Sequence, residues 1–262
     1  MTQPILTSGY SISLPVFAGV EVDGGAFRIE GEVQGTAFAL GGNYMLTARH
    51  VASGIPRSGK NQMVVGLQEP DGHFKAARVS SVEELDADLA LLEVEFLVPG
   101  SDAWFHRFGW REAPIEPFEA VRTVGYAYGM QTIGDRKSVV VRGFQGHIVS
   151  RLTEFKPVGW TGSSFAVYEL SFVAPRGLSG APLMNSQGTA TVHGVVIGNS
   201  ESKMMVFRSE ERVNEPAGVT AVEQYEALTL GVAVVASEVL SQESRVLGSS
   251  IKQHLQAHGL LA

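Results

Sequence analysis

Residues 177–182 read Gly-Leu-Ser-Gly-Ala-Pro, and this stretch decides how the fold is interpreted. It places one hydroxyl, that of Ser179, among glycines and other small or turn-forming residues. Glycine beside the serine makes a close approach of another group to the backbone possible. By itself the stretch is also typical of a turn, where serine often hydrogen-bonds its own backbone. Its meaning therefore depends on what the rest of the chain supplies.

Two further segments place a reactive side chain beside an apolar strand. They read Thr47-Ala48-Arg49-His50 and Asp88-Leu89-Ala90-Leu91-Leu92. A serine hydroxyl is too weak an acid to attack a carbonyl alone, so it needs an imidazole to accept its proton and an anion to orient that imidazole. His50, Asp88 and Ser179 supply these groups in that order along the chain.

Each of these residues also has a structural interpretation. Ser179 could be a turn serine, and His50 could cap a helix or lie satisfied in the core. Asp86 competes with Asp88, because it lies two residues away and would face the same side of an extended strand. We favour Asp88, since the apolar strand begins directly after it.

Short segments rich in Val, Ile, Phe and Tyr, separated by Gly and Pro, predict an all-β protein. The first series of expected strands covers residues 16–22, 26–33, 36–40, 44–47, 63–68, 74–82 and 89–94. The second series covers residues 120–126, 138–150, 165–172, 182–184, 191–197, 204–207 and 230–235. The charged, Pro-containing stretch 99–119 lies between them, so we expect two domains, residues 1–110 and 111–262.

The three segments together resemble those of the chymotrypsin-fold, or trypsin-like, serine peptidases, in the bacterial style without disulfides. The resemblance spans roughly residues 35–235 and implies two six-stranded antiparallel β-barrels. It implies a catalytic triad of His50, Asp88 and Ser179, with an oxyanion hole formed by the N–H groups of Gly177 and Ser179. The expected partner is a protein or peptide substrate, and no cofactor or metal is expected.

The resemblance also places a substrate-binding pocket and shows two departures from the family pattern. Val173 stands where trypsin-like enzymes carry an acid, and Val196 where glutamate-specific relatives carry a histidine, so the substrate residue on the acyl side should be uncharged and apolar. Ile197, Gly198 and Asn199 complete the expected substrate-binding set, with Ile197 in place of a serine that supports the aspartate. Leu178 replaces the aspartate that pairs with a new N-terminus in zymogen-activated members, so the loop should be preformed or ordered by a substrate, an activating partner or assembly.

Composition excludes several other classes. The 262 residues hold 20 Lys and Arg against 27 Asp and Glu, a net charge of −7, which argues against nucleic-acid binding. There is no cysteine, so disulfides and thiolate metal sites are excluded. The longest apolar run, residues 230–236, is too short for a membrane span. No basic residue precedes Arg28, so we expect no secretory signal and a cytoplasmic location.

Three remaining features carry weaker expectations. Leu247, Ile251 and Leu255 recur at helical spacing, so we expect a C-terminal helix packed against the second barrel. His193 precedes the pocket strand by one residue and should face outward. The charged connection 199–226 is either a lid or docking loop for a partner, or an ordinary hairpin.

Two rival functions stay open. The first is a catalytically silent module that keeps the groove and binds a partner; a complete triad argues against it. The second is an esterase, but its serine elbow belongs to an α/β sheet with the order Ser, Asp, His, which this chain does not show.

Overall fold

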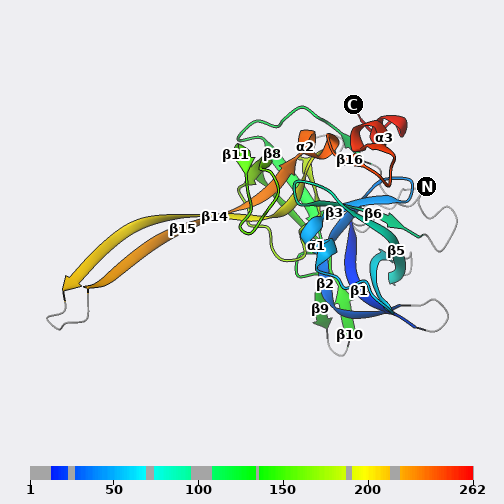
Figure 1. Ribbon diagram of the computed structural model, residues 1–262, viewed down its shortest axis with the longest axis horizontal. Helices are drawn as coiled ribbons and strands as arrows, with labels where there is room; N and C mark the ends of the chain where they lie inside the picture. The colour runs from blue at the N-terminus through cyan, green and yellow to red at the C-terminus, as the bar shows by residue number, and fades with distance from the viewer. Residues whose placement is uncertain are drawn as a thin grey trace.

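The computed structural model describes residues 13–22, 27–68, 74–95, 108–133, 136–186, 191–212 and 219–261. These residues form two β-barrels and a long two-stranded arm that projects from the second barrel (Figure 1). No helix in these ranges is long and apolar enough to cross a membrane.

The first barrel contains six strands, all antiparallel. They are β1 (Leu14–Glu21), β2 (Phe27–Gly41), β3 (Tyr44–Ala48), β4 (Asn61–Gln68), β5 (Phe74–Glu84) and β6 (Leu89–Val94). Their order is β1-β2-β3-β6-β5-β4, and the barrel is closed because β1 pairs with both β2 and β4. Almost every residue of β6 is buried, as expected for a continuous apolar run in a strand.

The second barrel also contains six antiparallel strands. They are β8 (Ala120–Gly125), β11 (Arg142–Phe155), β12 (Phe165–Leu170), β13 (Pro182–Asn185), β14 (Thr191–Arg212) and β15 (Val219–Val235). They follow the order β13-β8-β11-β12-β15-β14, and the pairing of β13 with β14 closes the ring. The all-β, two-barrel prediction is therefore confirmed.

Smaller elements flank the second barrel. The short β7 (Gly109–Trp110) pairs in parallel with β14, outside the ring. A separate hairpin joins β9 (Met130–Ile133) to β10 (Arg136–Val139). The ring of Trp110 stacks on that of Phe38 of the first barrel, with centroids 5.9 Å apart, so β7 lies where the two barrels meet.

One continuous cluster of buried apolar side chains extends through both barrels. It includes Phe38 and Leu91 from the first barrel and Val195 and Val234 from the second, all at most 1% exposed. Each such side chain contributes about 1.5–3 kcal/mol on burial. This shared core fixes the two barrels against each other, and the site described below depends on that.

The C-terminal segment returns to the first barrel. It contains α2 (Ala236–Leu240), β16 (Glu243–Ser244), β17 (Ser249–Ser250) and α3 (Ile251–Ala257). A capping box between Ser250 and Gln253 begins α3, so the expected helix is present. The helix contacts the first barrel, however: His254 meets Tyr44 of β3 edge to face at 5.5 Å. Its packing thus differs from the predicted packing against the second barrel.

Two local predictions are corrected by the structure. His193 is only 6% exposed, not outward-facing, because β14 at this point is covered on both sides by neighbouring segments. Burial lowers the pKa of His193, and a hydrogen bond with the backbone of Ala113 opposes this shift. The expected strands at 191–197, 204–207 and 230–235 are parts of only two long strands, β14 and β15. The polar residues between them continue the pairing instead of ending it.

Candidate active site

His50 is presented by the first turn of a short helix at the end of β3. The helix α1 (Arg49–Ser53) follows β3 directly, with extended Ala48 as its N-cap residue. Val51 and Ala52 are buried, whereas about half of the His50 side chain is exposed. Because its apolar neighbours anchor the turn, the imidazole is held at the surface between the barrels.

Asp88 lies in the tight turn between β5 and β6. Ala87 and Asp88 have φ values of 56° and 57°, a left-handed conformation that non-glycine residues rarely adopt. The turn is held by the hydrogen bond from the N–H of Leu89 to the carbonyl of Asp86 and by the buried strand that begins there. Local strain of this kind is found at functional sites.

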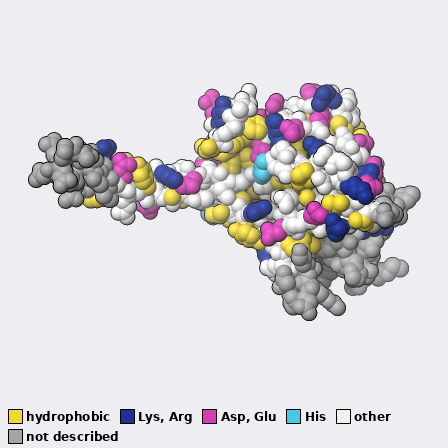
Figure 2. All heavy atoms as spheres, turned by 60° about the horizontal axis from the view of Figure 1, so that its bottom comes forward, with side chains coloured by type: hydrophobic (Ala, Val, Ile, Leu, Met, Phe, Trp, Pro, Cys, Tyr) yellow, Lys and Arg dark blue, Asp and Glu magenta, His cyan; other side chains and the backbone are white. Residues whose placement is uncertain are grey.

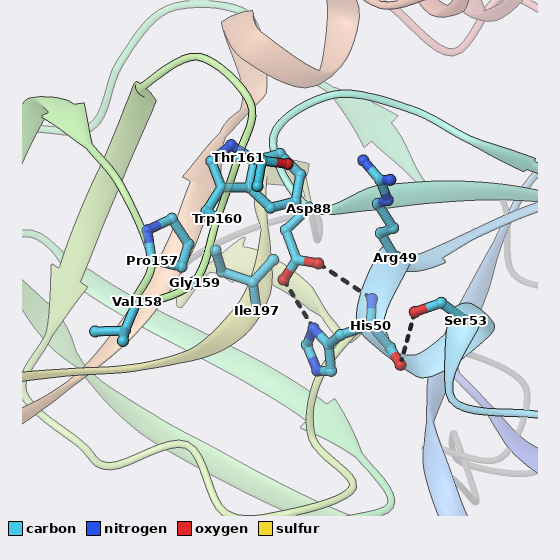
Figure 3. A pocket seen from close by; sticks show the side chains of 10 residues that line it. All are labelled: Arg49, His50, Ser53, Asp88, Pro157, Val158, Gly159, Trp160, Thr161 and Ile197. Atoms are coloured by element: carbon cyan, nitrogen blue, oxygen red, sulfur yellow. Dashed lines mark hydrogen bonds and ion pairs between the residues drawn. The ribbon is translucent and has the colours of Figure 1, made fainter.

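His50 and Asp88 are joined by two hydrogen bonds (Figure 3). The Nδ1 of His50 lies 2.7 Å from Oδ2 of Asp88, and the backbone N–H of His50 donates to Oδ1 at 3.1 Å. The carbonyl of Asp88 also accepts the N–H of Arg49 at 2.8 Å. Among the hydrogen bonds of the described residues, none joins Asp86 to Arg49 or His50, and the N–H of Asp86 donates to Gln242. With Nδ1 directed at the carboxylate, Nε2 of His50 is the ring nitrogen left to accept a proton.

The serine loop comes from the second barrel and is bonded to the first through Thr36. The Oγ1 of Thr36 donates to the carbonyl of Gly177 at 2.7 Å and accepts the N–H of Tyr126 at 3.0 Å. The N–H of Thr36 donates to the carbonyl of Ser179 at 2.8 Å. Thr36 is completely buried, so these bonds form away from water. The sequence did not single out Thr36, because nothing in its local pattern shows a contact 141 residues away.

Gly180 is required by the close approach of this loop to the first barrel. Its φ is 89°, and a Cβ there would lie 2.0 Å from the carbonyl oxygen of Thr36. Gly177 has a φ of 92° and would place a Cβ 2.4 Å from the carbonyl oxygen of Tyr126. Neither position admits a side chain, so the two glycines flank Ser179 for steric reasons.

The hydroxyl of Ser179 donates a long hydrogen bond of 3.4 Å to the carbonyl of Ile197. Among the described residues, no hydrogen bond joins Ser179 to His50. The structure thus brings His50 and Asp88 into contact and places Ser179 beside β14, with its hydroxyl turned to that strand.

The backbone N–H groups of Gly177 and Ser179 make no hydrogen bond among the described residues. The carbonyl of Arg176 accepts the N–H of Tyr128 at 2.8 Å. This bond fixes the peptide between Arg176 and Gly177 with its oxygen directed at Tyr128. Within the ranges that the structure describes, neither the N–H of Gly177 nor that of Ser179 has an acceptor. Leu178 is completely buried in the second barrel, so apolar packing holds the loop where zymogen-activated peptidases use an ion pair.

A family model described as a trypsin-like peptidase domain matches residues 35–195, more than half of the chain. The chain belongs to this trypsin-like peptidase family. No curated protein matches it in sequence.

Solved structures show the same peptidase fold. The apo protease domain of MamO from Magnetospirillum magneticum has a TM-score of 0.56 and 17% identity, over 90% of this chain and 98% of that one. Neuropsin, a serine protease expressed in the limbic system of mouse brain, has a TM-score of 0.52 and 11% identity, over 87% of this chain and 90% of that one. At these identities the likeness shows the fold.

A cleft of about 440 Å³ lies beside His50 in this peptidase domain. One wall is formed by Arg49, His50, Ser53 and Asp88. The other is formed by the connection between β11 and β12, residues 157–161, with Ile197 between the two walls (Figure 3). This connection was not predicted from the sequence. Its only signal was an aromatic residue, Trp160, in a turn rich in glycine.

Trp160 and Arg49 link the two walls of the cleft. The guanidinium of Arg49 lies 5.2 Å from the centre of the Trp160 ring, a cation–π contact. Arg49 also pairs with Glu84 at 2.8 Å, and the indole N–H of Trp160 donates to the carbonyl of Ser163. The wall that comes from the second barrel is thereby tied to the helix that carries His50.

The expected substrate-binding residues fall into two groups. Val196 and Ile197 are buried, and Val196 is part of the core of the second barrel. Val173 is about half exposed, and Gly198 has open space around its Cα, with nothing within 4 Å of a Cβ placed there. Asn199 accepts the N–H of Ala174 at 2.7 Å and donates to its carbonyl at 2.9 Å, which fixes the segment around Val173 to β14. Their roles toward a substrate stay predictions.

No group of three or more His, Cys, Asp or Glu side chains that could hold a metal ion occurs among the described residues.

Proposed function

We propose that the chain is a serine endopeptidase with Ser179 as nucleophile, His50 as general base and Asp88 as the group that orients His50. The observation that carries this proposal is the 2.7 Å pair of His50 and Asp88, positioned next to a serine loop with two free N–H groups. An imidazole with a fixed tautomer, a hydroxyl and an anion-binding pair of N–H groups are the components that acyl transfer requires.

In the proposed reaction, Oγ of Ser179 leaves the carbonyl of Ile197, gives its proton to Nε2 of His50 and attacks the substrate carbonyl. The resulting oxyanion accepts hydrogen bonds from the N–H groups of Gly177 and Ser179, each worth about 3 kcal/mol of the barrier. His50 then donates the proton to the leaving amine, and the acyl group stays on Ser179. Water, activated by His50, attacks this ester and releases the carboxylate product with Ser179 regenerated. Asp88 keeps the proton of Nδ1 in place throughout.

The substrate is proposed to be an extended peptide with an uncharged, apolar residue on the acyl side of the cleaved bond. The positions that would contact this residue, Val173 and the segment from Val196 to Asn199, carry no charged side chain. A buried substrate carboxylate or ammonium without a partner would be costly there. The peptide would add to the open edge of β14 beside Ile197.

Cleavage of β-casein, an unfolded protein, tests this proposal. Mass spectrometry of the products should show internal cuts after uncharged apolar residues in the wild type, and none with Ser179→Ala. Cuts mainly after Lys, Arg or Glu would contradict the proposed pocket. Equal cleavage by wild type and variant would contradict the assignment of Ser179.

A second candidate function is a partner-activated or silent peptidase-like module. The hydrogen bond from Ser179 to Ile197 favours it, because the hydroxyl is not directed at His50. In this case casein would stay intact, and a partner would be needed to turn the serine toward the imidazole. The free N–H groups of Gly177 and Ser179 favour the active enzyme instead.

A further inference from the structure

The arm consists of the outer halves of β14 and β15 beyond the barrel. The two strands stay paired from Ser200 with Leu230 to Arg212 with Val219, which at about 3.4 Å per residue is roughly 40 Å of ribbon. Figures 1 and 2 show it standing clear of the two barrels. Such a two-stranded ribbon has no core of its own, and a ribbon of this kind is only marginally stable in water by itself.

Exposed apolar side chains gather in the middle of the arm. Met204, Met205, Val206 and Phe207 are consecutive on β14 and between 43% and 63% exposed. Ion pairs flank them, Lys203 with Glu201 and Arg208 with Glu223. Hydrophobic side chains are visible among charged ones along the arm in Figure 2. We call residues 204–207 the apolar cluster; an exposed patch of this kind marks an interaction site.

One edge of the arm starts at the active site. On β14, the pairing with β13 ends at Val195, and Val196 still bonds to Gly180 and Ala181. The carbonyl of Ile197 then points to the same side, where it meets the hydroxyl of Ser179.

From Ile197 outward this edge of β14 is unpaired in the part of the chain that the structure describes. In an extended strand, backbone groups two residues apart face the same edge. The open edge therefore runs through Asn199, Glu201, Lys203 and Met205. It stops at the bulge after Met205, where the register shifts. The edge proposed to bind the peptide beside Ser179 and the edge of the arm are thus one continuous strand edge.

We propose that this edge is an extended docking strand for the substrate itself, an inference that rests on the proposed peptidase function. A strand added in the antiparallel order of the barrel places the residues upstream of the cleaved bond on the arm. Counting from Ile197, Met204 and Met205, the members of the apolar cluster that precede the bulge, lie opposite substrate residues about seven and eight positions upstream of the one that faces Ile197. The substrate is accordingly an unfolded or extended protein segment with apolar residues in that window.

The continuity of the edge favours a substrate over a second copy of the chain as the occupant. A second copy could cover the apolar cluster, but nothing in such a contact would require the edge to begin at Ser179. An extended substrate held at Ser179 meets the arm without any change of direction. Self-association through the arm would therefore contradict the proposal.

The test uses two peptides from the β-casein site that the enzyme cuts fastest, with four or twelve residues upstream of the bond and the same downstream sequence. The wild type is compared with a shortened-arm variant, in which an Asn-Gly turn replaces residues 203–227 and joins the paired Ser202 and Leu228. In the wild type, kcat/KM should be about tenfold higher for the long peptide, mainly through KM. In the variant the two peptides should be equal, and the short peptide should be cut as fast as by the wild type.

Paired residues on the two strands give a matched control. Met205→Ser, on the open edge, should lower kcat/KM for the long peptide about threefold or more, whereas Tyr225→Ser, directly opposite on β15, should change it less than about twofold. An undiminished preference for the long peptide in the shortened-arm variant would overturn the proposal. So would a dimer in sedimentation that needs the arm while the peptide preference is unaffected by shortening. If the wild type neither cuts casein nor reacts with a fluorophosphonate, the proposed peptidase function is contradicted, and so is the docking proposal that rests on it.

Discussion

The two barrels contribute to the site in different ways. The first barrel supplies both His50 and Asp88, which lie on a short helix and in a tight turn. The carboxylate of Asp88 is hydrogen-bonded to both the ring and the backbone N–H of His50. The second supplies a loop whose position depends on a distant residue, Thr36, and whose hydroxyl bonds to Ile197. The His50–Asp88 pair is therefore set by local structure, while the position of Ser179 is set by the contact between the barrels.

The largest expected effect comes from breaking that contact at Gly180. Gly180→Ala would force a Cβ against the carbonyl of Thr36 at a φ of 89°, so the loop must move. We expect a loss of about 3 kcal/mol or more in the free energy of unfolding, and loss of Ser179 reactivity. Urea unfolding and fluorophosphonate labelling measure both. Gly143→Ala, on an exposed part of β11 with open space around it, should leave both unchanged; equal losses in the two variants would contradict this account.

Breaking the pair in the first barrel should affect chemistry far more than stability. Asp88→Asn would leave most of the turn intact but remove the anion that fixes the His50 tautomer, so kcat should fall about 10⁴-fold. The free energy of unfolding should change by only about 1 kcal/mol. Asp86→Asn serves as the control and should keep kcat within about twofold. A larger loss of kcat in Asp86→Asn than in Asp88→Asn would mean that Asp86, and not Asp88, orients His50.

Thr36→Val tests the contact between the barrels, because valine keeps the shape of threonine and removes the hydroxyl that joins the barrels. The carbonyl of Gly177 and the N–H of Tyr126 would lose their partner, which should cost about 2 kcal/mol and lower the labelling rate of Ser179 about tenfold. Thr47→Val removes a bond to the carbonyl of Thr36 inside the first barrel and should leave the labelling rate within about threefold. A similar drop in labelling for both would show that the loss is not specific to the loop.

The smallest expected effect concerns Glu83, which holds the C-terminal segment on the first barrel. It accepts hydrogen bonds from the Ser244 hydroxyl and from the N–H groups of Arg245 and Val246. Burial alone would raise the pKa of Glu83, but these bonds and the Arg245 side chain lower it below the ordinary 4.5.

A lowered pKa in the folded state means that Glu83 stabilises the fold above its unfolded-state pKa, and that this stability is lost as pH falls through the folded-state pKa. Glu83→Gln should therefore lower Tm by a few degrees near neutral pH and by less in acid. Thermal unfolding at several pH values measures the difference. The exposed Glu30→Gln should show no such dependence, and a gap between Glu83→Gln and wild type that widened in acid would contradict the sign.

The sequence predicted the two barrels from its strand pattern, and it predicted the association of His50 with Asp88 through the resemblance of their motifs to those of trypsin-like peptidases. It could not show Thr36, whose partners lie in the other barrel, nor the return of α3 to the first barrel, since both are tertiary contacts. His193 was misjudged because the strand that carries it is covered on both sides. The arm was divided into separate strands because its polar residues resemble a loop, although cross-strand pairing with β15 keeps them extended.

We propose that the two barrels together activate Ser179, and intact-mass labelling with a fluorophosphonate tests this activation most directly. We expect one adduct in the wild type, and none in Ser179→Ala or His50→Ala. No adduct in the wild type, or an adduct that persists in Ser179→Ala, would contradict it.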